Sequence, residues 1–243
     1  MKNIRSFTFF RSDEEYDTAS LEDGEFVEFS TMFRETSAVT TTKLAGRRKI
    51  RIINEDKERE FLEFAVSHEH LKKESGRYME TSFDYYFAKI RMTLWAESNS
   101  GVLTVMGPGK SVEEVLKRCR ISGEIEIYDI ERLWKIIHDE ELANIKGAYF
   151  GDLRITNVNS AMIFGTRVDD SDEFTRYNDF GSVTGLIITI EELGETIRIG
   201  RSGIVLYSNC ETDLEYLENA LGKRKWINSL LSTEKPLFEN QTQ

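Results

Sequence analysis

The apolar positions between Gly185 and Leu221 form three short runs, followed by a longer segment with a helical period. The runs read GLIITI, TIRIG and SGIVLYS, and only a few polar or glycine residues separate one from the next. Short apolar runs joined by such turns are typical of an antiparallel meander. The following segment spaces its apolar residues three and four apart, which predicts a helix that covers one face of the meander.

The same patterns predict strands and helices along the rest of the chain. Alternating or β-branched segments predict strands at residues 4–10, 25–33, 37–44, 49–53, 82–96, 102–106, 123–130, 152–158 and 161–168. Helical spacing predicts helices at residues 55–73, 111–120, 130–145, 210–221 and 223–231, with Ser111 as an N-cap and Glu114 completing a capping box. The polar run at residues 169–179 predicts a loop.

Two of the predicted strand-to-helix junctions resemble each other. Residues 54–66 (NEDKEREFLEFAV) align without gaps with residues 209–221 (NCETDLEYLENAL), and five of the thirteen pairs are identical. Any capped amphipathic helix that follows a strand produces similar letters, so chance similarity stays open beside true repetition. Repetition predicts an α+β fold of repeated units, each a curved antiparallel sheet followed by a covering helix. We place the units at residues 1–75, 76–150 (with an extra strand and helix) and 151–232, before a flexible tail at residues 233–243.

Composition indicates a soluble, ordered protein. Hydrophobic residues make up 40% of the chain and charged residues 31%, as in ordinary globular domains. No apolar run is long enough to cross a bilayer, and residues 1–10 lack the features of a secretory signal peptide. The two cysteines, Cys119 and Cys210, are too few for a disulfide framework. These observations predict a cytoplasmic protein without a membrane partner.

The charge balance narrows the range of partners. The formal net charge is −11, which argues against broad, non-specific binding to phosphates. Basic clusters occur at residues 47–51, 117–120 and 223–225. The last two lie at the ends of predicted helices, where cations complement the helix dipole, so they do not require a ligand.

Motifs for catalysis or metal binding are weak. The sequence GPGKS at residues 107–111 lacks the first glycine that a phosphate loop needs. His68 and His70 are two apart in a predicted helix and therefore point to different faces. The acidic residues between 169 and 179 lack the spacing of an EF-hand. We therefore expect a protein that is not an enzyme, with no catalytic residues, metal site or cofactor.

From Ile155 the chain reads ITNVNSAM, later GLIITIEEL, then RSGIVLYSN and a helix. This series resembles one half of the TATA-box-binding protein family: a strand with an I-x-N-V core, an aliphatic strand opening on Gly-Leu-Ile, an SG turn and a short strand leading into a long helix. The resemblance covers residues 153–231, and more weakly residues 78–120. It implies a curved sheet with helices on its convex face and a concave face that binds the DNA minor groove.

Carried over residue by residue, the resemblance implies five nucleic-acid contacts on the concave face: Asn157, Val158, Phe180, Ile188 and Ser208. The first two match the family's Asn-Val pair, the third a wedging phenylalanine and the last a small polar residue on the final strand. Asn157 is equally well explained as a strand-end residue that bonds its own backbone. Arg198 and Gly200 stand where the family has an apolar residue and a second wedge.

Two classes of function follow from the sequence. The first is a non-catalytic, transcription-associated factor that binds double-stranded DNA through the concave sheet face. The alternative is an acidic protein-interaction or regulatory module on the same scaffold, which binds another protein or forms a homodimer and does not bind nucleic acid. Salt-dependent binding to an AT-rich duplex separates the two.

Overall fold

A computed structural model describes residues 3–12, 21–32, 36–54, 57–98, 100–190 and 195–232. These residues form an α+β protein with twelve strands and four α-helices, which confirms the expected class. Contacts divide the chain into two units. The N-terminal unit is Ser6–Glu126, and the C-terminal unit joins Met1–Arg5 to Ile127–Gln243.

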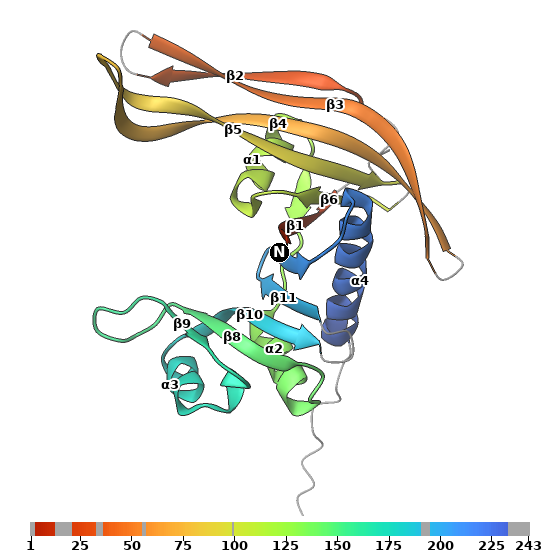
Figure 1. The fold of residues 1–243 in the computed structure, drawn as a ribbon, viewed down its shortest axis with the longest axis vertical. Coiled ribbons are helices and arrows are strands. Elements are labelled where there is room, and N and C mark those ends of the chain that lie inside the picture. The colour runs from red at the N-terminus through yellow and green to blue at the C-terminus, as the bar shows by residue number, and fades with distance from the viewer. Residues whose placement is uncertain are drawn as a thin grey trace, which may run out of the picture. The chain divides into compact units, whose positions relative to one another are not determined.

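The N-terminal unit is built on a sheet of long antiparallel strands (Figure 1). The strand order is β2-β3-β4-β5-β6-β1, and the short strand β7 pairs with β1. The elements are β1 (Asn3–Ser12), β2 (Gly24–Met32), β3 (Thr36–Asn54), β4 (Lys57–Tyr78), β5 (Thr81–Glu97), β6 (Val102–Met106), α1 (Val112–Arg118) and β7 (Gly123–Ile125).

Helix α1 packs against this sheet and closes its hydrophobic core. Val112, Val115 and Leu116 of α1 are buried in one cluster with side chains from β3 to β6. The helix follows Ser111, but the Ser111 side chain makes no capping hydrogen bond, so the expected capping box is wrong. At the start of β7, Gly123 has a φ of 145°, and a Cβ there would lie 2.2 Å from the Arg11 carbonyl oxygen. Only glycine fits this approach of β7 to β1.

The expected helix at residues 55–73 is wrong, because the described part of this segment lies in β4. Its buried residues alternate: Leu62, Phe64, Val66 and His68 are buried, while Ala65 is exposed. This is the period of a strand with one face on a core. The stripe of residues 61, 62, 65 and 66 is equally compatible with a helix, but pairing with β3 and β5 on both sides decides the structure.

The C-terminal unit is a second sheet with helices packed on it (Figure 1). The strand order is β12-β11-β10-β8-β9, and all four of these pairs are antiparallel. The predicted meander is confirmed, and its two expected helices are one continuous helix. The elements are α2 (Ile130–Asp139), β8 (Asn144–Gly151), β9 (Ala161–Phe164), α3 (Asp172–Phe180), β10 (Ser182–Ile190), β11 (Glu195–Gly200), β12 (Gly203–Ser208) and α4 (Asp213–Ser232).

The helices of this unit cover one face of its sheet. Helices α2 and α3 contact β10, and α4 contacts β12. Alternation along the strands turns six aliphatic side chains toward the helices, all of them buried: Leu186, Ile188, Ile197, Ile199, Ile204 and Leu206. Glu195 lies on the same side, where it pairs with Lys223 of α4. The opposite face carries the residues between these.

Four further expectations for this unit are corrected by the structure. Residues 152–158 form a turn instead of a strand, because Asp152 and Asn157 have left-handed φ values of 53° and 64°. Residues 172–180 form α3 instead of a loop, and Ser171 caps this helix by accepting a hydrogen bond from the Phe174 amide at 3.2 Å. The predicted helix at 130–145 ends at Asp139, and the strand expected at 161–168 ends at Phe164.

The proposed sequence repeat does not align equivalent elements. Residues 58–66 lie in a strand, whereas residues 213–221, their partners in the alignment, lie in helix α4. Of the expected unit boundaries, residue 75 lies inside β4 and residue 150 inside β8. The tail at 233–243 lies outside the described residues. Among the helices that the structure describes, none is long and apolar enough to cross a membrane.

Candidate functional site

The face of the C-terminal sheet that points away from the helices is the first candidate site, and we call it the open sheet face. Strand register arranges it in three rows across β10, β11 and β12. The rows are Thr189–Thr196–Tyr207, Ile187–Arg198–Val205 and Gly185–Gly200–Gly203. Arg198 is exposed, and Thr189, Thr196, Tyr207 and Ile187 are half-buried, so solvent reaches this face.

An aromatic and cationic series crosses the open sheet face beside the glycine row. The Arg198 guanidinium carbon lies 5.6 Å from the centre of the Tyr149 ring on β8. Phe164 on β9 meets the same ring edge-on at 6.4 Å between ring centroids. A Cβ on Gly185 would lie 3.4 Å from the Tyr149 ring, so the glycine leaves room for that ring to lie over β10. The result is a flat surface with one cation held between strands.

The distribution of charge on this sheet is uneven. Glu195 is the only acidic residue in strands β8 to β12, all of which lie in the described part of the chain. Its carboxylate points to Lys223 and Asn219 on α4. The chain as a whole carries a net charge of −11. The described strands therefore present no carboxylate on the open sheet face, in an otherwise acidic protein.

The five residues predicted to contact nucleic acid do not share this face. Ile188 is 0% exposed under the helices, so it is not part of the open surface. Ser208 ends β12 on the helix side, with its hydroxyl 2.9 Å from the Cys210 thiol. Asn157 and Val158 lie in the turn between β8 and β9, and Phe180 is the last residue of α3, 47% exposed.

The residues that do form the face were missed for an identifiable reason. Alternation along β10 offers two sets of side chains, and the resemblance selected the set with Ile188, whereas the open sheet face carries Ile187 and Thr189. The choice follows from which face the helices cover. Arg198 was already noted at a position of the expected binding surface, and it does lie on the open sheet face.

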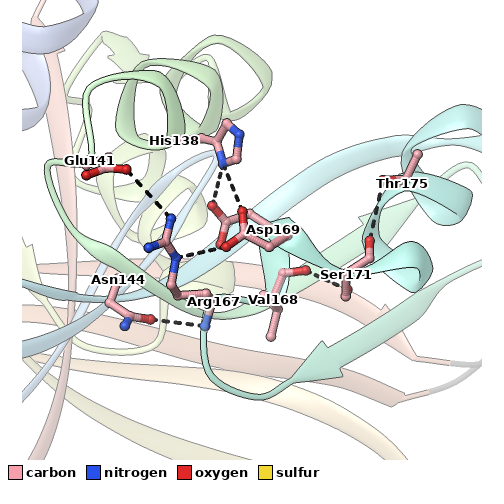
Figure 2. Close-up of polar contacts among 9 residues, drawn as sticks. His138, Glu141, Asn144, Arg167, Val168, Asp169, Ser171 and Thr175 are labelled. Carbon is pink, nitrogen blue, oxygen red and sulfur yellow. Dashed lines mark hydrogen bonds and ion pairs between the residues drawn. The ribbon is translucent and has the colours of Figure 1, made fainter.

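A pocket at the end of α2 is the second candidate site (Figure 2). It has a volume of about 270 Å³ and lies between α2, the start of β8 and the turn after β9. Polar side chains form one wall of the pocket, and His138 lies at one end of that wall. Its Nδ1 atom lies 2.7 Å from Asp169 Oδ2 and 3.8 Å from Asp170 Oδ1. The sequence had assigned these acidic residues to a solvated loop and had not paired them with a histidine.

Arg167 completes the polar wall of the pocket. Its Nε donates to Asp170 Oδ2 at 2.8 Å, and a terminal nitrogen lies 3.9 Å from Glu141 Oε1 (Figure 2). Its backbone N–H donates to the Asn144 side-chain oxygen at 3.2 Å. Arg167 has a left-handed φ of 52°, which turns the chain from the end of β9 back toward α2. Hydrogen-bonding groups thus hold this turn at a fixed place beside the helix.

The N-terminal unit contains a buried histidine between its sheet and α1. His68 Nδ1 lies 2.9 Å from the Thr42 hydroxyl, and Nε2 lies 3.5 Å from a carboxylate oxygen of Glu114. Burial lowers the pKa of His68 below its usual value, and the Glu114 carboxylate opposes that effect. Because β4 is a strand, His68 and His70 lie on the same face and stack at 6.1 Å, which corrects the expectation of different faces.

A second pocket, lined by both apolar and charged side chains, opens next to this histidine. It has a volume of about 320 Å³ and is lined by Phe26, Val27, Glu114, Lys117 and Arg118. Arg118 donates to the Thr40 hydroxyl at 2.8 Å and to Glu114 at 2.6 Å. These bonds tie α1 to β3, so the basic residues at the end of α1 have a structural role.

Comparisons of the sequence with protein-family models and with curated proteins give no match.

Proposed function

We propose that the protein is a non-catalytic DNA-binding module that contacts double-stranded DNA through the open sheet face of its C-terminal unit. The observation that carries this proposal is that the strands present no acidic side chain on this face. The one acidic residue of strands β8 to β12, Glu195, points to α4. A carboxylate on a binding face would repel phosphates at short range, whereas this face presents Arg198. The remaining acidic surface then disfavours other orientations of the DNA on the protein.

The side chains on this face suit a minor groove better than a major groove. Sheet proteins that bind the minor groove use apolar and β-branched side chains against the sugars and aromatic wedges against the base steps. Ile187 and the two threonines provide the first kind of contact, and Phe164, which is 60% exposed, provides an aromatic side chain at the sheet edge. Arg198 is placed to bind phosphate or to enter a narrow groove.

The order of elements supports a TATA-box-binding-protein-like arrangement for the C-terminal unit. A meander ends in the short strand β12, which leads into the long helix α4 on the covered face. In the N-terminal unit β6 leads into α1 in the same manner. We base the proposed relation between the units on this order of elements and not on the aligned residues 54–66 and 209–221.

Fluorescence anisotropy with labelled duplexes tests the proposal. We expect the full chain to bind an AT-rich duplex at low salt, more weakly at physiological salt, and more tightly than a GC-rich duplex or a single strand. Arg198→Ala should weaken binding about tenfold, since such contacts contribute roughly 1–3 kcal/mol. Arg176→Ala removes an exposed cation from α3 on the covered side and is the matched control.

Two results would refute the proposal. One is the absence of binding to any duplex at low salt. The other is an equal loss of affinity in the Arg198 and Arg176 variants, because the sheet face would then have no special role. If the protein instead prefers single-stranded DNA, the proposed binding mode changes from contact with the minor groove to stacking of bases on Tyr149 and Phe164.

A second function, self-association, is favoured by strand β9. This strand ends the sheet order of the described C-terminal unit, and its Met162 and Phe164 are 51% and 60% exposed. An unpaired strand edge with apolar side chains is a template for pairing with a second chain. Light scattering after size-exclusion chromatography should then show a dimer that Phe164→Asp converts to a monomer, and a monomeric wild type would exclude this function.

A further inference from the structure

The end of helix α2 and the short 3₁₀ helix η3 (Val168–Asp170) bring three ligand-type side chains together. One nitrogen of His138 and one oxygen each of Asp169 and Asp170 all lie within 4.8 Å of one another. The two segments are 31 residues apart in the sequence and meet beside β8 (Figure 2). An imidazole with two carboxylates is a ligand set suited to first-row transition metals.

Asp169 gives this cluster a feature that ordinary surface acids lack. Its side chain is only 7% exposed and lines the pocket of about 270 Å³. Its Oδ1 atom is buried and has no hydrogen-bond partner among the described residues. A buried carboxylate oxygen without a hydrogen-bond partner destabilises the folded protein. A cation in the pocket would provide the missing partner.

The distances fit ligands that surround one ion. Two atoms that each lie about 2.1 Å from a common ion, at tetrahedral or octahedral angles, are about 3.0–3.4 Å apart. In the structure His138 Nδ1 lies 2.7 Å from Asp169 Oδ2 and 3.8 Å from Asp170 Oδ1. These two separations bracket the required range, and the ligand atoms of all three side chains lie within 4.8 Å of one another, so small rotations of the side chains must close the set around an ion.

The charges around the pocket also favour a divalent cation. The group contains three carboxylates, on Glu141, Asp169 and Asp170, and one guanidinium, on Arg167, which pairs with Glu141 and Asp170. With a neutral imidazole the net charge of this group is −2. Arg167 binds Oδ2 of Asp170 and leaves Oδ1 on the side of His138. Second-sphere hydrogen bonds of this kind orient carboxylate ligands in metal sites.

We propose that His138, Asp169 and Asp170 bind one divalent transition-metal ion, with zinc as the representative ion, and that the pocket leaves its remaining positions to water or a small ligand. The ion joins the last turn of α2 to the segment that leads into α3. The site lies on the helix side of the unit and is independent of DNA binding by the sheet.

Metal binding can be measured on the full chain after removal of any affinity tag and treatment with a chelator. Isothermal titration with Zn²⁺ should give one site per chain, and Co²⁺ should give the visible absorption bands of a bound ion. His138→Gln and Asp169→Asn should each weaken Zn²⁺ binding by at least about 100-fold, since first-sphere losses exceed the 10–100-fold effect of outer-sphere changes. Asp179→Asn removes an exposed acid of α3 outside the cluster and should bind like the wild type.

Circular dichroism spectra of the variants verify that they are folded. If one fails to fold, the other variant and the Co²⁺ absorption spectrum of the wild type, whose bands depend on the ligands of the ion, keep the test open. The proposal is overturned if no ion binds at one site per chain. It is equally overturned if Zn²⁺ affinity survives His138→Gln, or if only Mg²⁺ and Ca²⁺ bind.

Discussion

Replacing Phe64 by alanine tests the strand assignment of β4 directly. Phe64 is 0% exposed and belongs to the cluster that α1 closes. Its neighbours on the same face, Leu62 and Val66, are equally enclosed, so the cavity left by the ring cannot collapse easily. Removal of a buried phenyl ring costs about 3–5 kcal/mol of unfolding free energy. That is a large part of the 5–15 kcal/mol by which domains are typically stable.

Ala65→Lys is the matched control one residue further along. Ala65 is exposed on the opposite face of β4, so a lysine there should change the unfolding free energy by no more than about 0.5 kcal/mol. A helix with a stripe at residues 61, 62, 65 and 66 predicts the reverse: a costly charge at Ala65 and a milder change at Phe64. The pair of variants therefore distinguishes the two structures.

Urea unfolding followed by tryptophan fluorescence gives the measurement. The chain has three tryptophans, of which Trp95 lies in the N-terminal unit and is fully buried. Replacing Trp134 and Trp226 by phenylalanine leaves Trp95 as the reporter. A lower midpoint at constant slope measures lost stability. A cost above about 2 kcal/mol for Ala65→Lys, together with one below about 1 kcal/mol for Phe64→Ala, would refute the strand assignment.

Two further predictions concern the N-terminal unit. Because burial lowers the pKa of His68 in the folded state, the unfolded chain takes up the proton first as the pH falls. The contribution of His68 to stability should therefore be complete above about pH 6.5 and decrease below it. His68→Gln should make the urea midpoint depend less steeply on pH across the acidic range. If the variant's midpoint falls as steeply as that of the wild type, this explanation is contradicted. Gly123→Ala should cost more than about 1–3 kcal/mol in the same assay, because the new Cβ would lie 2.2 Å from a carbonyl oxygen at a φ of 145°. Gly222→Ala, in an open position of α4, should instead stabilise by up to about 1 kcal/mol, and equal effects of the two substitutions would argue against the Gly123 contact.

The meander of β10 to β12 could be predicted because its information is local. Each run pairs with the next one along the chain, and the turns between them are short. Strand β4 could not be recognised in this way. Its residues include strong helix formers such as Glu and Lys, although it pairs with its neighbours β3 and β5 through connections of only two residues, as Asn54↔Lys57 and Tyr78↔Thr81 show. Pairing on both sides outweighs helix propensity here.

The candidate sites depend partly on local sequence patterns and partly on contacts between segments that are far apart in the sequence. The position of Arg198 followed from the spacing of the meander, but the facing direction of Ile187 and Ile188 depends on where α2 and α4 pack. The cluster of His138 and Asp169 joins residues 31 apart through the β8–β9 hairpin. A histidine in a helix and an acidic run carry no mutual signal in the sequence until that hairpin is known.

The grouping of residues 3–5 with the C-terminal unit sets the order in which parts of the chain can fold during synthesis on the ribosome. The pairs of β1 with β6 and β7 lie in the N-terminal unit. These partner strands have been synthesised once residue 126 has emerged from the ribosome. Residues 3–5 must instead wait until the segments after residue 127 have been translated. Contacts between such distant parts of a chain form slowly. A bulky fusion at the N-terminus is therefore expected to delay the maturation of the C-terminal unit, although that unit lies at the other end of the sequence.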